Sequence, residues 1–498
     1  MRGKVVLFYP PYDGPPLSAP LCLLSLASSL RQARFQVVVV DAAIEPNYRD
    51  VVLREVQDAL CIGLSVLTGP MIIGAIEIAT AVKNLHPRLP VIFGGWHPSL
   101  LPEQTLQESF VDMVVRGQGD LTLVEVAEAL AEGRSLGSIQ GLSWKLEGHQ
   151  ERNPERRVQL LEALPTPAFD LVDFDAYAKA CGAKKLAYAT SVGCPYACNY
   201  CTDMVFYKRR FNTLSAERVV GELASLVARY RIEEVALLDS NFPVDLRRAL
   251  AIARGILDSG VKFRWTFQAS TDFLCRMSDD EVRLLGASGV THMGFGTEST
   301  SEPVLKLMNK RHQRVDEMFE TARKAAIGNI RVTFNLIFGY PGETEADRVV
   351  TFRTMTEIAR EFSNVSFSPN VFTPYPGIPI WPQLRSLGVR EPSSLREWAS
   401  MPLGANILPW LQGRERARLD RMLNYFLLHN QICRKNRAYP LARRFVRRAV
   451  LSPIRWRLRS SRYSFPWELW LARSTERPVQ RRSLVTGQPL PKEAANAC

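Results

Sequence analysis

The stretch GCPYACNYC, residues 193–201, is the strongest signal in the chain for both fold and function. It follows the strand-like run 186–192 and places Cys194, Cys198 and Cys201 in a CxxxCxxC spacing, so one loop can present three thiols to one face of an iron–sulfur cluster. Such clusters require soft thiolate ligands and normally take four of them. Three cysteines therefore leave one iron with an exchangeable ligand. A zinc site or unrelated buried thiols are the plainer alternatives.

The spacing of the thiols, together with Tyr200 just before the last of them, resembles the signature of the radical S-adenosylmethionine (SAM) enzymes. The resemblance implies a [4Fe-4S] cluster whose open iron is chelated by the amino and carboxylate groups of SAM. It also implies that one electron, from an external donor of the flavodoxin or ferredoxin type, cleaves SAM to a 5′-deoxyadenosyl radical. By the same resemblance, the backbone of Tyr200 meets the adenine.

Length and composition predict a large globular protein. The chain has 498 residues, of which 46% are hydrophobic, enough for large cores and about three domains. Its nine cysteines are scattered apart from the triplet, which is not a disulfide framework and fits a reducing cytoplasm. The N-terminus enters a strand at once, and no run of 18 apolar residues occurs. We therefore expect a cytoplasmic protein that neither spans a membrane nor is exported.

Residues 1–135 alternate short apolar runs with amphipathic segments, a pattern typical of a doubly wound, Rossmann-like parallel sheet. Ligands of such sheets bind beyond the carboxyl ends of the strands. Glycine-containing loops follow these strand ends, and glycine lets the backbone approach a ligand closely. The predicted strands and helices are 4–8, 21–33, 36–40, 48–59, 61–64, 71–86, 91–94, 103–108, 113–115 and 121–131.

Two of these loops, GGWHPSL (94–100) and VVRGQGD (114–120), resemble stretches of the cobalamin-binding domain of B12-dependent radical SAM proteins. Gln118 and Asp120 depart from the glutamates usual in that group. The resemblance implies cobalamin contacts at Ser65, Thr68, Gly94, Gly95, His97, Gly117 and Gly119.

Other ligands of this first domain find less support. No DxHxxG motif occurs, so the histidine-on cobalt ligation of the methionine synthase type is not supported. A loop histidine before proline, such as His97, is more often a hydrogen-bonding residue than a metal ligand. The first strand is followed by YPPYDGPP instead of GxGxxG, so no dinucleotide phosphate fingerprint is present.

A linker is predicted over 136–185, with a weak hairpin pattern at 142–146 and 157–160. Residues 186–395 then show six strand-and-helix units, which predict a partial (β/α)6 TIM-like barrel with its chemistry at the carboxyl ends of the strands. The clearest helices are 216–230 and 344–362. The predicted strands are 186–191, 234–238, 263–269, 291–296, 331–338 and 365–372.

Motifs at these strand ends follow the order of the radical SAM family: DSNF at 239–242, GTES at 296–299, GYPGET at 339–344 and PYPG at 374–377. The resemblance implies that Glu298 and Ser299 contact SAM and that Asp239 lies near it. Ser240 replaces the second aspartate of the usual turn. For each motif alone, a turn or a helix cap is the plainer interpretation.

The region 396–498 is predicted to be helical and arginine-rich, with a disordered end at 477–498. From residue 401 it carries 20 Lys and Arg against 5 Asp and Glu, while the rest of the chain carries 43 against 45. Helices are predicted at 411–434 and 441–451. Paired arginines and interleaved aromatic residues suggest peripheral membrane contact through 441–473. A solvated arginine face and RNA contact are the alternatives, although nucleic acid is not the expected partner.

These features predict radical C-methylation of an unactivated carbon, with cobalamin as the methyl donor. The substrate would be hydrophobic (lipid, isoprenoid or tetrapyrrole) or a secondary metabolite, and no catalytic acid or base is predicted. An oxidative cyclase of the anaerobic magnesium-protoporphyrin ester type is the alternative. A tRNA methylthiotransferase needs three further N-terminal cysteines, where only Cys22 and Cys61 occur. A non-catalytic cobalamin sensor would not need the triplet.

Overall fold

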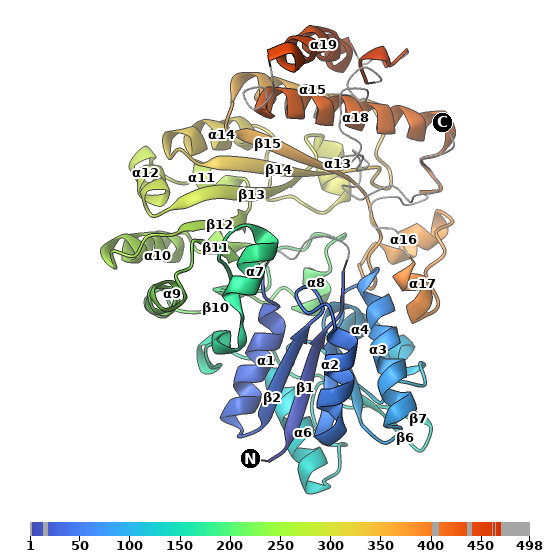
Figure 1. The fold of residues 1–498 in the computed structure, drawn as a ribbon. Helices are drawn as coiled ribbons and strands as arrows, with labels where there is room; N and C mark the ends of the chain where they lie inside the picture. Colours follow the sequence, from blue (N-terminus) through green and yellow to red (C-terminus); the bar gives the residue numbers. More distant parts are fainter. Residues whose placement is uncertain are drawn as a thin grey trace. The chain divides into compact units, whose positions relative to one another are not determined.

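The computed structural model describes residues 2–12, 18–400, 408–435, 441–460, 462–463 and 465–469, and the chain divides into two compact units (Figure 1). Unit 1 consists of residues 1–267, 374–381 and 390–401. Unit 2 consists of residues 268–373, 382–389 and 402–498.

Unit 1 begins with a sheet in the strand order β2-β1-β3-β4-β5-β6-β7. The first five strands are parallel, and the last two are antiparallel to their neighbours. The α/β parallel sheet predicted from the alternating pattern is therefore confirmed. The strands are β1 Lys4–Tyr9, β2 Gln36–Asp41, β3 Ala59–Ser65, β4 Val91–Gly94, β5 Met113–Val115, β6 Leu142–Leu146 and β7 His149–Arg152.

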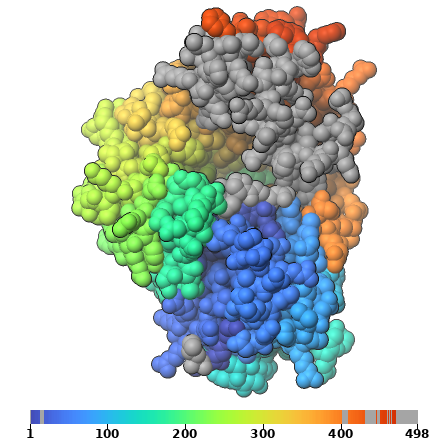
Figure 2. Space-filling view, viewed as in Figure 1, coloured from blue at the N-terminus to red at the C-terminus, as the bar shows by residue number. Residues whose placement is uncertain are grey.

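Helices cover both faces of this sheet, because its strands carry apolar side chains on both faces. On one face, α1 (Leu21–Gln32) and α6 (Asp120–Glu132) pack over side chains such as Val5 and Leu7, which are fully buried. On the other face lie α2 (Tyr48–Glu55) and α3 (Met71–Leu85), whose outer surfaces are visible in Figure 2. Two short helices, α4 (Trp96–Leu100) and α5 (Pro102–Leu106), follow β4.

The hairpin predicted in the linker is present, but its second strand was wrongly placed at 157–160. Strands β6 and β7 are joined by Glu147 and Gly148, with φ of +50° and +85°. Two central residues with positive φ make the tight turn that suits a two-stranded ribbon, so β7 starts at His149. Because β6 pairs with β5, the first sheet extends to Arg152 instead of ending near residue 135.

Unit 1 also contains the first repeats of the second βα region. Strand β11 (Glu234–Leu237) pairs in parallel with β8 (Lys185–Tyr188) on one side and, on the other, with the first residues of β12 (Arg264–Ala269), whose residues 264–267 belong to this unit. Helices α9 (Ala216–Tyr230) and α10 (Leu246–Asp258) follow β10 and β11 along the chain and bury their apolar stripes. The segment 374–381 and helix α17 (Leu395–Ala399) belong to this unit too.

Unit 2 holds three further parallel strands, β13 (Val290–Glu298), β14 (Arg331–Phe338) and β15 (Val365–Val371). Rings of Phe295, Phe334 and Phe367 pack in a row across them, with centroids 5.7 and 5.8 Å apart. The row continues to Phe426 of α18, 5.2 Å from Phe367. The accompanying helices are α12 (Asp279–Ala287), α13 (Glu302–Leu307), α14 (Glu317–Ile327), α15 (Glu345–Glu361) and α18 (Gly413–Lys435). A partial barrel of all six strands stays a prediction.

The last described helix, α19 (Leu441–Ser460), runs past the predicted end at residue 451 and through Pro453. A proline inside a helix removes one hydrogen bond and costs ~3 kcal/mol. Val450, Ile454 and Leu458 recur every four residues and are at most 2% exposed, so burial of this stripe offsets the cost. No helix in the described ranges is long and apolar enough to cross a bilayer.

Part of the arginine and aromatic set in the tail faces inward. The Arg457 guanidinium lies 2.6 Å from Glu468 and over the ring of Tyr425, and Tyr463 is 4% exposed. Trp470 and residues 477–498 lie outside the described part of the chain. So do the side chains of Arg443, Arg444, Arg447, Arg448 and Arg459.

Candidate functional site

The cysteine loop is closed at its base by a two-stranded antiparallel pair, β9 (Ser191–Val192) and β10 (Asn212–Thr213). The loop leaves β9 at Gly193, where φ is +78°. A β carbon at this position would lie 2.0 Å from the carbonyl oxygen of Arg210 at the other end of the loop. Only glycine permits both the backbone angle and this close approach.

The three thiols lie within this loop and form no disulfide, with Cys198 buried and the other two partly exposed. The amide of Cys201 donates to the carbonyl of Cys198 at 3.2 Å, which forms a tight turn between them. Burial raises the pKa of Cys201 to about 12, so its thiol is protonated until a cation binds. Among the described residues no three metal-ligating side chains converge into a complete site. The donor set, three soft thiolate ligands on one loop, fits an iron–sulfur cluster.

Asp239, at the end of β11, supports the strand that enters the cysteine loop. Its carboxylate accepts hydrogen bonds from the amide and hydroxyl of Thr190, at 2.8 and 2.6 Å, and from the hydroxyl of Ser191. Burial raises the pKa of Asp239, while these three donors favour its charged form. The carboxylate therefore anchors β9, and its contact with SAM stays a prediction.

Ser240 makes a second link to the loop. Its hydroxyl donates to the carboxylate of Asp203, two residues after the last cysteine, at 2.8 Å. Asp203 is 6% exposed, and burial raises its pKa. The carboxylate that the family turn carries at position 240 would face another carboxylate here. Serine at position 240 instead supplies a hydroxyl that donates to the carboxylate of Asp203.

At the carboxyl edge of the first sheet, the predicted cobalamin loops are joined by hydrogen bonds. The Thr68 hydroxyl lies 3.1 Å from His97 Nδ1, and the amide of His97 donates to the carbonyl of Val66 at 3.2 Å. Ser99 Oγ donates to the carbonyl of Gly95 at 2.6 Å and accepts from the amide of Gly117 at 2.9 Å. The structure therefore brings the loops after β3, β4 and β5 together.

His97 itself is enclosed by protein. Its side chain is 0% exposed, its ring packs edge-on against Trp398 at 5.9 Å, and its Nε2 is buried without a hydrogen-bond partner. Burial lowers the pKa of His97 to about 3, so the imidazole is neutral. This geometry favours a supporting residue over a cobalt ligand, and cobalamin contact stays a prediction.

The other residues predicted to contact cobalamin differ in how much free space surrounds them. A β carbon on Gly95 would meet Val66 and Ser65 within 3.0 Å, so protein atoms fill that space. Gly117, with φ of +74°, has nothing within 4 Å of the same position. Ser65 is buried and lies 3.5 Å from Cys22, while Gly94 and Gly119 are partly exposed. An open glycine at this edge fits a flat group that approaches the backbone.

Other residues of the RGQGD stretch have structural partners. The guanidinium of Arg116 donates to the carbonyls of Leu142 and Asn153 and so holds the β6–β7 hairpin. The Ser25 hydroxyl donates to Asp120 at 2.5 Å, which joins α1 to the start of α6. Gln118 accepts a hydrogen bond from the amide of Gln159 at 2.7 Å, so Gly117 is the open position of this stretch.

One contact that the motif analysis missed links the two predicted cofactor regions within unit 1. Trp96, from the GGWHP loop, packs on Phe206 with ring centroids 4.2 Å apart and on Tyr207 at 5.9 Å. Both partners follow the cysteine triplet by a few residues. Trp96 lies inside a recognised motif, but no local pattern predicts its distant partner. The sheet edge and the cysteine loop are therefore neighbours.

In unit 2, the predicted SAM residues Glu298 and Ser299 lie at a bulge that ends β13. Glu298 has φ of +63°, a left-handed conformation that costs an ordinary residue ~1–2 kcal/mol. The amide of Gln313 donates to the carbonyls of Thr297 and Ser299, at 2.6 and 3.4 Å, and so holds the backbone on both sides of Glu298. Strain of this kind is common at binding sites.

Comparison with known proteins agrees with these two regions. Residues 3–127 match the B12 binding domain, and residues 188–355 match the Radical SAM superfamily. An uncharacterized methyltransferase of Pyrococcus horikoshii is 29% identical over 76% of this chain and 82% of its own length. The hopanoid C-3 methylase of Methylococcus capsulatus is 26% identical over 75% and 70%.

The fold also matches a solved structure. The radical SAM methyltransferase TsrM from Kitasatospora setae, determined with cobalamin and a [4Fe-4S] cluster bound, has a TM-score of 0.66 at 21% identity. The match covers 79% of this chain and 76% of TsrM. The cysteine loop and the two matched domains define a radical SAM protein. More particularly, the chain joins a B12-binding domain to a radical SAM domain, and the cofactors of such an enzyme are cobalamin, SAM and an iron–sulfur cluster.

Proposed function

We propose that this enzyme transfers a methyl group to an unactivated carbon of a small-molecule substrate. The observation that carries the proposal is the packing of Trp96 on Phe206 and Tyr207, which brings the loop of the B12-binding domain beside the cysteine loop. A methyl donor must lie close to the carbon from which hydrogen is removed, since neither group diffuses during turnover.

Different residues of the chain would hold the three cofactors. Cys194, Cys198 and Cys201 would hold the cluster, and Gly193 and Asp239 shape the loop that presents them. The Glu298–Ser299 turn would bind SAM, and the glycines at the sheet edge would admit cobalamin. When bound, these groups supply a 5′-deoxyadenosyl radical and a transferable methyl group. An external flavodoxin- or ferredoxin-type protein would supply the electron.

For the substrate we propose a hydrophobic molecule such as a lipid, isoprenoid or tetrapyrrole, reached by peripheral contact of the tail with the membrane. Support comes from aromatic side chains in the tail: Phe445 is 75% exposed, Trp456 53%, Phe465 89% and Trp467 50%. Aromatic rings of this kind favour the interface of a bilayer. Sedimentation with anionic vesicles at low salt tests this contact. A chain that stays in the supernatant would exclude it.

The test of the reaction is anaerobic reconstitution with iron, sulfide, cobalamin, SAM and a reductant. Methylation predicts both 5′-deoxyadenosine and S-adenosylhomocysteine, because one SAM makes the radical and another restores the methyl donor. Cys198→Ala should lose both products and the cluster absorbance. Cys275→Ala, which removes a free thiol of α11 (Asp272–Cys275), is the matched control and should keep them.

The oxidative cyclase is the alternative outcome of the same assay. It predicts 5′-deoxyadenosine without S-adenosylhomocysteine. Cobalamin that does not stay with the protein after gel filtration would also contradict methylation. The two relatives described above are named as an uncharacterized methyltransferase and a hopanoid C-3 methylase, which favours methylation.

A further inference from the structure

The end of the cysteine loop carries three successive cations that none of the predicted cofactor sites uses. Lys208, Arg209 and Arg210 follow Cys201 within the same loop, and all three are exposed. Residues 1–400 as a whole are close to neutral, with 43 Lys and Arg against 45 Asp and Glu. The three charges are therefore a local concentration and not part of a generally basic surface.

These cations lie directly against the start of the cysteine loop. The guanidinium Nε of Arg209 donates to the carbonyl of Pro195 at 3.2 Å. The amide of Arg210 donates to the carbonyl of Tyr207 at 2.9 Å and closes a turn, and the carbonyl oxygen of Arg210 abuts Gly193. A protein that binds these cations is therefore brought next to the loop that presents the thiols.

The backbone at Lys208 and Arg209 is strained. Their φ angles are +52° and +59°, in the left-handed region that is unfavourable for residues with a β carbon. Glycine or asparagine would adopt this turn more easily. Strained backbone of this kind clusters at functional sites. Two long cationic side chains at such a turn therefore indicate a role outside the packing of the loop.

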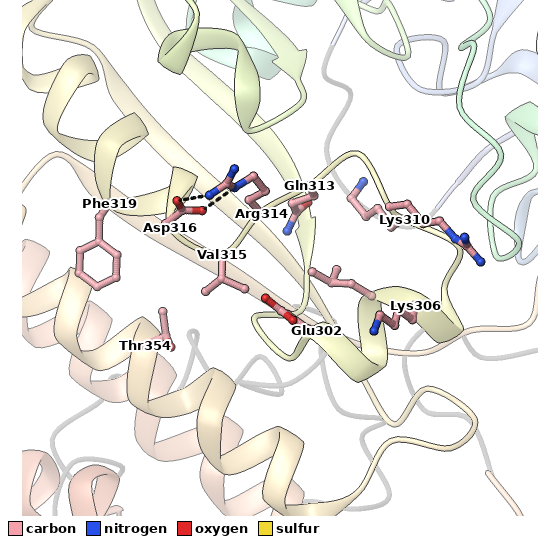
Figure 3. A pocket seen from close by; sticks show the side chains of 11 residues that line it. Glu302, Lys306, Lys310, Gln313, Arg314, Val315, Asp316, Phe319 and Thr354 are labelled. Atoms are coloured by element: carbon pink, nitrogen blue, oxygen red, sulfur yellow. Dashed lines mark hydrogen bonds and ion pairs between the residues drawn. The ribbon is translucent and has the colours of Figure 1, made fainter.

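Arg209 and Arg210 form no ion pair with a carboxylate in the described part of the chain. A different arrangement is seen in a pocket of unit 2 beside α13 and α14 (Figure 3). There, Asp316 binds Arg314 at 3.2 and 3.0 Å, as the dashed lines show. The positive charge at the cysteine loop is thus left for a partner with carboxylates of its own.

A second stretch of the chain, residues 155–161, runs beside these cations. Glu155 pairs with Lys208, but both side chains are more than half exposed, and such a surface pair is weak and exchangeable. Farther along, the side-chain amide of Asn212 donates to the carbonyl of Gln159 at 2.5 Å. The part of this stretch between Glu155 and Gln159 therefore borders the same surface.

This second stretch adds a cation and an apolar side chain. Arg157 is exposed, and Leu160 is 68% exposed. Protein interfaces combine apolar contact with a polar, charged rim. We call the exposed set the basic face: Arg157, Leu160, Lys208, Arg209 and Arg210.

We propose that the basic face binds the acidic surface of a one-electron carrier protein that reduces the cluster. In the step that this contact serves, the carrier loses one electron and the cluster gains one, and no bond or proton moves. Complementary charge speeds the encounter of two proteins and fixes their orientation. The proposal rests on the radical chemistry of the proposed function, which needs an electron, and does not depend on methyl transfer.

The test compares two electron sources for the reconstituted full chain, with 5′-deoxyadenosine as the measured product. One source is an acidic flavodoxin kept reduced by its reductase, and the other is dithionite. Lys208→Gln combined with Arg210→Gln should raise the KM for flavodoxin about 5-fold, and adding Arg209→Gln about 10-fold. The double variant should keep its iron content and its rate with dithionite, which needs no docking surface. Salt should raise the KM most in the unmodified chain.

Arg231→Gln combined with Arg254→Gln is the matched control, because it also removes two exposed cations from unit 1. Arg231 has φ of +53°, as left-handed as Lys208. It precedes the amino end of β11, whereas the cysteine loop follows the carboxyl end of the parallel strand β8. The control should leave the KM for flavodoxin unchanged.

The outcomes separate this proposal from the proposed function. No 5′-deoxyadenosine with either electron source would contradict the radical chemistry itself. Activity with dithionite, together with an equal KM for flavodoxin in the double variant and the control, would overturn only the docking proposal. Calorimetry of the same chains with flavodoxin and with an RNA oligonucleotide adds a direct measure of binding. Tighter binding of the RNA, weakened by the double variant, would also overturn the proposal.

Discussion

The hydroxyl of Ser240 donates a 2.8 Å hydrogen bond to the carboxylate of Asp203, and this bond joins the end of β11 to the segment after the cysteine triplet. Both residues lie in unit 1, and Asp203 is almost fully buried. A buried acceptor that loses its donor pays the cost of desolvation, about 1–3 kcal/mol. The pair therefore stabilises the loop that presents the thiols.

Substitutions at Ser240 should separate two effects: loss of the hydrogen-bond donor to Asp203, and repulsion between Asp203 and a second carboxylate. Ser240→Ala removes the hydrogen bond and should lower stability by ~1 kcal/mol. Ser240→Asp places a second carboxylate against Asp203 and should lower the iron content after reconstitution further. Ser240→Asn restores a donor and should recover most of the iron. Iron and sulfide analysis with thermal denaturation measures these effects. Equal iron content in all three variants would show that the bond does not support the loop.

Gly193→Ala should prevent the cysteine loop from closing. A β carbon at Gly193 would lie 2.0 Å from the carbonyl oxygen of Arg210, so the backbone must move and the thiols with it. We expect loss of most of the cluster absorbance near neutral pH.

Gly182→Ala is its matched control. Gly182 has φ of +79°, almost the same as Gly193, but has nothing within 4 Å of the β-carbon position. It should cost only the ~1 kcal/mol of left-handed strain and keep the cluster. If both variants lose iron equally, backbone strain and not the Arg210 contact is the cause.

The buried His97 should make stability depend on pH. Its pKa is lowered from 6.5 to about 3 by burial, so the unfolded chain binds a proton that the folded chain does not. The stability it contributes is fully present above pH 6.5 and is lost as the pH falls toward 3, by up to ~1.4 kcal/mol per pH unit.

His97→Asn should reduce this slope, because asparagine does not titrate and can still contact Thr68. The free energy of unfolding in urea, measured from pH 4 to pH 7, gives the two slopes. The exposed His149 of β7 provides the control substitution, His149→Asn. If the free energy of unfolding falls with pH equally steeply in His97→Asn and in the unmodified chain, His97 is not the group that causes the pH dependence.

Gln313→Leu should weaken SAM binding if the Glu298 turn binds SAM as proposed. The variant frees the carbonyls of Thr297 and Ser299 and releases a turn whose central residue has φ of +63°. We expect the KM for SAM to rise by about 5-fold to 50-fold, with a smaller change in kcat, since one or two hydrogen bonds are lost. Gln313→Asn, which keeps the amide on a shorter side chain, should recover part of the loss. A change in kcat alone would argue against positioning.

The order of strands and helices could be predicted because hydrophobic periodicity is a local property. Strands β4, β5 and β14 and helix α9 have the predicted bounds. The second strand of the hairpin was misplaced because its turn depends on Glu147, a residue that rarely takes a positive φ. The end of α19 was misplaced because burial of Ile454 and Leu458 outweighs the cost of Pro453.

The site was predictable as a set of motifs but not as a set of contacts. The motifs correctly marked the strand ends where loops gather, since the carboxyl ends of parallel strands share one edge. The sequence could not show that Arg116 binds a hairpin or that Trp96 packs on Phe206, because those partners come from distant segments. Gln313 carries no motif and could be found only from its position beside the end of β13.

The short pair of strands at the base of the cysteine loop makes that loop a replaceable module. Because Ser191–Val192 and Asn212–Thr213 lie side by side, the chain leaves and re-enters the structure at one point. Replacing residues 193–211 with a tight two-residue turn should therefore leave the path of β8 and α9 unchanged. Such a chain would be a scaffold without a cluster, into which loops with other ligand sets could be grafted.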